Sequence, residues 1–104
     1  MPEPIGENKV RLSGRVRFRD VAGQGVLVQL EEGRVLVVNE VGLYIVQALS
    51  RQAMTESELA EAVAQAFEVD AARAKSDVAL FLEQLRGEKA LQTVGESGGG
   101  PAGG

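Results

Sequence analysis

Apolar and polar residues alternate over the first part of this sequence. At 15–19 the order Arg-Val-Arg-Phe-Arg places Val16 and Phe18 on one face of an extended chain and three arginines on the other, which predicts a half-buried strand. An apolar run of strand length follows at 26–30, and the segment 34–38 is rich in β-branched residues. The turn sequences Gly-Gln-Gly and Glu-Glu-Gly separate these segments, so we expect three antiparallel strands.

The same alternation predicts which side chains of the sheet face the core. The expected inner positions of the second and third strands are Val26, Val28, Leu30, Leu36 and Val38. Val35 and Val37 then point to the opposite face. Three interpretations stay open: another segment covers these valines, a short strand tolerates their exposure, or they belong to a peptide groove.

After position 38 the apolar positions recur about every four residues, which predicts helices. Asn39 suits the N-cap of a first helix that ends near Ser50. The sequence Thr-Glu-Ser-Glu at 55–58 has the form of a capping box and begins a second helix. Asp70 is a candidate cap for a third helix, and Gly87 is a candidate stop signal.

Three strands followed by three helices indicate one α+β domain, with the helices on one face of a three-stranded antiparallel sheet. Gly42, in the first helix, would allow another element to approach closely. We assign residues 9–94 to this domain. The polar segment 1–8 and the glycine-rich segment 95–104 are expected to be flexible. Whether the glycine-rich tail is natural or engineered stays open.

Composition removes most catalytic chemistries. The sequence has no cysteine and no histidine, which excludes disulfides, thiolate nucleophiles, imidazole bases and the usual zinc ligands. Glu56, Glu58 and Glu61 lie close together, but they suit the exposed start of a helix better than a carboxylate active site. We therefore expect a binding domain that is not an enzyme and has no metal or cofactor.

Charge and hydropathy limit the partners. No apolar run approaches the roughly 18 residues of a membrane span, and the N-terminus lacks a signal-peptide pattern, so we expect a cytoplasmic protein. The net charge is −4, yet the segment 9–19 carries five basic residues and no acidic one. An acidic chain is a poor general nucleic-acid binder, although the basic strip could attract an acidic peptide.

A strand at the edge of a sheet can accept a peptide as an added strand. If 34–38 is such an edge, its unpaired backbone groups are available for this pairing. The third helix offers a second wall, since Lys75 and Arg86 continue beyond its apolar stripe at 100° per residue. The opposite flank, marked by Leu80, is an alternative wall, and a solvated flank without function is a third interpretation.

This layout resembles the PqqD-like family, the small recognition domains of pathways that make ribosomally synthesised and post-translationally modified peptides (RiPPs). The resemblance spans roughly Val10 to Val94. The residues that carry it are Val38, Asn39, Gly42, Ile45, Leu49, Glu58, Leu59, Phe67, Asp77, Val78, Phe81, Leu82 and Leu85.

The resemblance implies a fold similar to winged helix-turn-helix domains and a function in peptide binding. Family members bind the leader segment of a precursor peptide as an extra strand between the third strand and the third helix. They present it to a modifying enzyme, often a radical S-adenosylmethionine enzyme, and act as peptide chaperones without a cofactor. Carried over by position, the implied peptide-binding residues are Arg34, Val35, Leu36, Val37, Val38, Lys75, Val78, Leu82 and Arg86.

One departure from the family pattern concerns the turn between the first two helices. Family members frequently have an Asp-Gly pair between the first two helices, where this chain has Ser-Arg-Gln-Ala-Met at 50–54. Two alternative functions stay open. A winged-helix DNA-binding regulator is disfavoured by an acidic second helix, while a homodimerisation module would use the same strand edge as the peptide.

Overall fold

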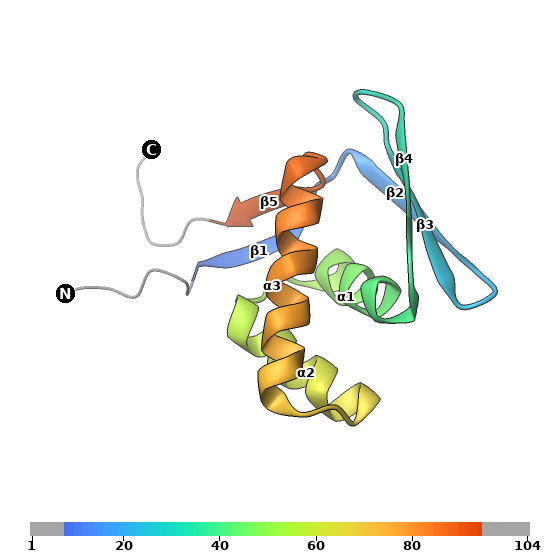
Figure 1. Ribbon diagram of the computed structural model, residues 1–104. Coiled ribbons are helices and arrows are strands. Elements are labelled where there is room, and N and C mark those ends of the chain that lie inside the picture. Colours follow the sequence, from blue (N-terminus) through green and yellow to red (C-terminus); the bar gives the residue numbers. More distant parts are fainter. Residues whose placement is uncertain (1–7, 95–104) are drawn as a thin grey trace.

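The computed structural model describes residues 8–94 of the 104-residue chain (Figure 1). In chain order the elements are β1 (Lys9–Leu12), β2 (Val16–Val21), β3 (Gln24–Gln29), β4 (Arg34–Val38), α1 (Glu40–Arg51), α2 (Glu56–Phe67), α3 (Ala71–Gly87) and β5 (Leu91–Val94). The predicted α+β class and the order of three antiparallel strands before three helices are confirmed. The expected flexibility of residues 1–7 and 95–104 concerns positions outside the described range.

The three central strands form an antiparallel sheet in the order β2-β3-β4. A two-residue turn joins β2 to β3 at Ala22 and Gly23, whose φ angles of 56° and 88° lie in the left-handed region typical of tight hairpins. This turn comes earlier than the Gly-Gln-Gly pattern predicts, so β3 begins at Gln24. The second turn contains Gly33, with a φ of 69°, and lies where the sequence predicts it.

The inner face of β3 is displaced by one residue from the prediction, which was wrong for this strand. Gly25, Leu27 and Gln29 are buried, whereas Val26 and Val28 are half-buried on the outer face. Leu30, also expected inside, is 51% exposed. A shift of one residue moves every side chain of a strand to the other face.

A buried glutamine explains this difference. The Gln29 side-chain oxygen accepts a hydrogen bond from the backbone N–H of Glu32 at 2.8 Å, and its amide nitrogen donates to the Lys89 carbonyl at 3.5 Å. With both ends of its amide paired, Gln29 can occupy a core position that its polarity argues against. In β4 the prediction is confirmed: Val38 is buried and Leu36 half-buried, while Val35 and Val37 are exposed.

A second sheet joins the two ends of the domain. β1 pairs with β5 in antiparallel register, from Lys9 opposite Val94 to Leu12 opposite Leu91. Val10 also exchanges two backbone hydrogen bonds with Met54, of 2.8 and 2.9 Å, which attaches β1 to the segment between α1 and α2. Local patterns do not predict this sheet, because its two short strands lie about eighty residues apart in the chain.

Local capping interactions define the starts of α1 and α2. The Asn39 side chain accepts from the Gly42 N–H at 2.9 Å. Thr55 and Glu58 form the reciprocal pair of a capping box, with bonds of 2.9 and 3.0 Å. Both predictions are confirmed. Asp70 precedes α3 as predicted, but its side chain makes no capping hydrogen bond.

All three helices contribute to one hydrophobic core. α1 packs against β3 and β4 on one side and against α2 on another, and α3 lies along α2. The largest side chains with essentially no exposed surface are Ile45, Val46, Leu49, Leu59, Val63, Val78 and Leu85. Burial of each such side chain stabilises the fold by about 1.5–3 kcal/mol relative to exposure. This core holds the sheet and α3 in fixed relative positions.

Candidate functional site at the free edge of β4

β4 is an edge strand, as the sequence analysis required for peptide addition. It pairs with β3 on one side, and within residues 8–94 no strand pairs with its other side. Unpaired backbone groups of an edge strand are a template for an added strand. The free edge of β4 is therefore the first component of the candidate site.

The hydrogen-bonding phase of the sheet shows which residues of β4 face this edge. Leu30 N–H donates to the Arg15 carbonyl at 2.8 Å, in line with the β2–β3 register. Because the bonding direction alternates along a strand, even-numbered residues of β3 bond to β2 and odd-numbered residues bond to β4. The β4 partners of the odd-numbered residues include Leu36 and Val38. The N–H and C=O groups of Val35 and Val37 consequently point toward the free edge.

A groove between the start of α1 and one flank of α3 is the second component. It includes a hollow of about 400 Å³. The residues that line it are Asn39, Val41, Gly42, Arg73, Asp77, Leu80, Phe81 and Gln84. Leu80 is 69% exposed, which is the highest value among the large apolar side chains of the described part. Apolar contacts and hydrogen-bonding groups thus lie together beside the end of β4.

Gly42 sets the distance between β4 and α3. A Cβ atom at this position would lie 2.8 Å from the Val38 Cβ and 3.0 Å from the ring of Phe81. Val38, Gly42 and Phe81 therefore stack in one row from the strand to the helix. The predicted close approach at Gly42 is confirmed, and the elements that approach are β4 and α3.

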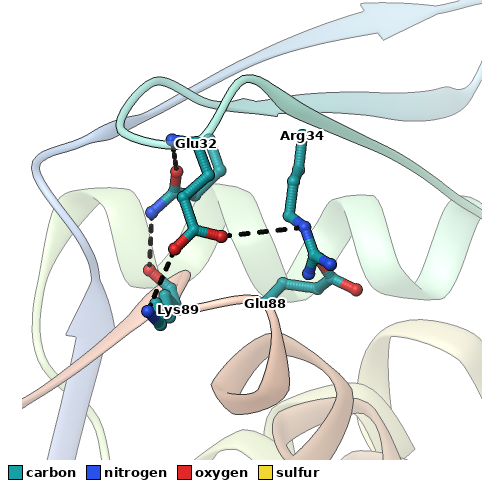
Figure 2. Close-up of polar contacts among 5 residues, drawn as sticks. Glu32, Arg34, Glu88 and Lys89 are labelled. Atoms are coloured by element: carbon teal, nitrogen blue, oxygen red, sulfur yellow. Dashed lines mark hydrogen bonds and ion pairs between the residues drawn. The ribbon is translucent and has the colours of Figure 1, made fainter.

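Ion pairs join the turn before β4 to the end of α3, as Figure 2 shows. Arg34 Nη1 lies 3.0 Å from Glu88 Oε1, and Lys89 Nζ lies 3.0 Å from Glu32 Oε2. The Arg34 Nε and Glu32 Oε1 atoms, 3.8 Å apart, connect the two pairs. This polar cluster joins β4 to α3 at the end of the strand opposite Asn39.

The hydrogen bond and positive charge of Lys89 lower the pKa of Glu32, and Glu32 in turn raises the pKa of Lys89. A lowered carboxyl pKa adds stability above the unfolded-state pKa, and this stability is lost as pH falls through the folded-state pKa. A raised lysine pKa adds stability that is lost as pH rises through its folded value. Both effects are small because the groups are exposed to solvent.

We expect Lys89→Met to lower stability slightly at neutral pH, and the difference from the parent to shrink as the solution is acidified. Urea unfolding at neutral and acidic pH measures this. Lys75→Met is the matched control, since Lys75 forms no ion pair with any residue in 8–94. A difference between Lys89→Met and the parent that is independent of pH would contradict the role of the Glu32 pair.

The four predicted peptide-binding residues of α3 do not lie together on one surface of the helix. Val78 and Leu82 lie in the core, with 0% and 3% exposure, and offer no surface to a peptide. Lys75 and Arg86 lie on the flank of α3 turned away from the β4 groove. Lys75 lines a different hollow of about 620 Å³, together with the start of α2.

The β4 residues Arg34, Val35, Leu36, Val37 and Val38 all lie on the candidate edge. The flank of α3 beside the groove is the one marked by Leu80, which the sequence analysis keeps as the alternative wall. Val41, Asp77 and Phe81 were not among the predicted site residues. For Asp77 and Phe81, the helical positions relative to Leu80 were the available signal, whereas Val41 lies in α1 and joins the site only through the approach of α1 to α3 at Gly42 and Phe81.

The described residues offer no metal site and no membrane segment. Within 8–94, no three acidic side chains gather as a metal site would need. No helix of this range is long and apolar enough to cross a bilayer.

Solved structures share this fold. The chain is similar to the structure described as TbiB1 in complex with the TbiA(beta) leader peptide, with a TM-score of 0.72 and 22% identity over 83% of this chain and 99% of that one. It is also similar to lasso peptide synthetase B1 complexed with the leader peptide, with a TM-score of 0.67 and 20% identity over 80% and 96%.

A third similar structure is the PqqD truncation of Methylobacterium extorquens PqqCD, described as a functional and stand-alone RiPP recognition element. The TM-score is 0.69, with 22% identity over 85% of this chain and 93% of that one. The chain thus shares the α+β fold of these three structures. No curated protein sequence matches the chain.

A comparison of the sequence with protein-family models identifies the family. The model of the family described as coenzyme PQQ synthesis protein D (PqqD) matches residues 24–91, which is more than half of the chain. This chain belongs to that family, and the predicted family resemblance is confirmed.

Proposed function

We propose that this domain captures the leader segment of a ribosomally synthesised precursor peptide as an added strand on β4 and presents it to a modifying enzyme. The observation that carries the proposal is the free edge of β4 beside the α1–α3 groove. The family match supports it, as do the similar structures that hold a leader peptide.

Strand addition would divide the leader side chains between two faces. In an added strand, successive side chains point to opposite sides of the sheet. One set would enter the groove beside Val41, Leu80 and Phe81, and the other would lie next to Val35 and Val37. Backbone hydrogen bonds would supply affinity, and the groove would supply specificity.

The domain has no catalytic role in this proposal. The sequence has no histidine or cysteine to serve as base, nucleophile or metal ligand. We infer that chemistry is performed by a separate peptide-modifying enzyme, of which a radical S-adenosylmethionine enzyme is one class. No cofactor of the domain itself enters the proposal.

An NMR titration tests the proposal. The labelled domain is titrated with a synthetic leader segment of the precursor peptide encoded beside its gene. We expect amide shifts concentrated in β4, in the first turn of α1 and on the Leu80 flank of α3. Absence of shifts at high peptide concentration would overturn the proposal and favour the DNA-binding or homodimerisation alternatives.

A pair of substitutions distinguishes the two flanks of α3. We expect Leu80→Gln to weaken leader binding about fivefold, because loss of about 1 kcal/mol of apolar contact corresponds to that factor. Lys75→Gln, on the opposite flank, should leave binding unchanged. Isothermal titration calorimetry measures both. The reverse pattern would return the site to the Lys75 and Arg86 flank.

A further inference from the structure

Exposed apolar side chains gather on the sheet face turned away from the helices. Of the five large apolar residues in 8–94 that are prominently exposed, four lie on this outer face: Val21, Leu30, Val35 and Val37, with exposures of 50 to 63%. The fifth is Leu80, in the groove. The half-buried Val26 and Val28 of β3 belong to the same outer face, because each is opposite an exposed valine of β4. We call these six outward residues of the sheet the valine face.

A row of arginines borders the valine face along β2. Arg17 and Arg19 are opposite Val28 and Val26 in the register, and Arg15 continues the row beside Leu30. Arg17 donates to the carbonyls of Gly14 and Val16. None of the three forms an ion pair with any residue that the structure describes. Their charges are therefore available to an external carboxylate.

We propose that the valine face is a second docking surface, for a partner protein that presents apolar side chains bordered by carboxylates. The inference rests on the proposed function in one respect: the partner is identified there as the peptide-modifying enzyme. A leader strand on the β4 edge lies beside this face and does not cover it. Leader and enzyme can thus be bound at the same time.

Charge argues against a second copy as the occupant. A two-fold contact brings the same surface together twice. The outward positions of β2, β3 and β4 include two arginines, Arg17 and Arg19, and no aspartate or glutamate, and Arg15 precedes them in the same row. Two copies would place arginines against arginines or against valines, with no carboxylate to pair them, which is unfavourable on desolvation.

The apolar centre argues against nucleic acid. Phosphate binding derives its affinity from clustered basic groups, and here the centre and the β4 side of the face are aliphatic. The net charge of −4 opposes such binding further. Three short strands present only about 250 Å² of sheet, from the usual strand spacing and rise, so we expect a transient contact.

Charge reversal tests this surface. The probe is the purified modifying enzyme encoded beside the gene of this chain, and calorimetry or biolayer interferometry measures its affinity for the full chain. We expect Arg17→Glu with Arg19→Glu to weaken enzyme binding at least tenfold. Leader affinity, measured on the same samples, should change less than twofold.

The matched control is Arg51→Glu with Lys75→Glu, which changes net charge equally at exposed positions away from this face that form no ion pair with any residue in 8–94. It should leave enzyme affinity unchanged. Val21→Ser with Leu30→Ser tests the apolar contribution and should also weaken the enzyme complex. Circular dichroism establishes that each variant is folded.

Several results would overturn the inference. Equal enzyme affinity for the Arg17/Arg19 variant and the parent would do so, as would an equal loss in the control or no enzyme binding by the parent. Self-association or duplex DNA binding that the Arg17/Arg19 variant abolishes would assign the face to another occupant. Failure of leader binding in the parent would instead overturn the proposed function, which this design measures separately.

Discussion

Replacing Val37 with proline is expected to abolish leader binding in a domain that stays folded. The Val37 N–H faces the free edge of β4, so its loss breaks no hydrogen bond to β3. Proline is tolerated at edge positions of this kind. An added strand, however, loses a donor and meets the pyrrolidine ring. We expect affinity to fall more than tenfold, measured by calorimetry with the synthetic leader.

Two further variants define what this result means. Val37→Thr keeps the backbone donor and the β-branched side chain, and should bind nearly as well as the parent. Leu36→Pro removes an N–H that faces β3 and should destabilise the sheet itself by about 1–3 kcal/mol, because its hydrogen-bond partner in β3 is left unpaired. Undiminished leader affinity in folded Val37→Pro would exclude strand addition at β4.

The second large effect is expected at Gly42. Gly42→Ala adds a methyl group 2.8 Å from Val38 and 3.0 Å from Phe81, and both neighbours are held by the core. Overpacking of this kind costs about 1–3 kcal/mol. We expect a lower melting temperature, by roughly 4–8 °C for each kcal/mol, and weaker leader binding because Phe81 lines the groove.

Gly87→Ala is the control for Gly42→Ala. Gly87 also lies in a helix, but no atom lies within 4 Å of a Cβ added there. Alanine should be neutral at this position or stabilise the helix by up to about 1 kcal/mol. Thermal unfolding followed by circular dichroism compares the two. Equal stability of both variants would show that Val38 and Phe81 can move to accommodate the added methyl group without a loss of folding free energy.

Local interactions made much of this fold predictable from sequence alone. The Asn39 cap and the capping box at 55–58 involve atoms three residues apart, so their signals are complete within the segments that they start. The alternation of side chains at 16–18 and 35–38 is likewise a local signal, because one face of each strand is buried and the other is exposed. The absence of cysteine and histidine determined which catalytic chemistries the chain lacks.

Tertiary structure decided the features that depend on distant partners. Gln29 can point inward because its side-chain amide forms hydrogen bonds with the backbone of Glu32 and Lys89. β1 and β5 are strands because each supplies the hydrogen bonds of the other across the whole domain. The groove flank of α3 was decided by the packing of its core stripe, which buries Val78 and Leu82 and turns Leu80 toward the start of α1. A helical stripe predicts which face is buried, but its neighbours determine which flank borders the site.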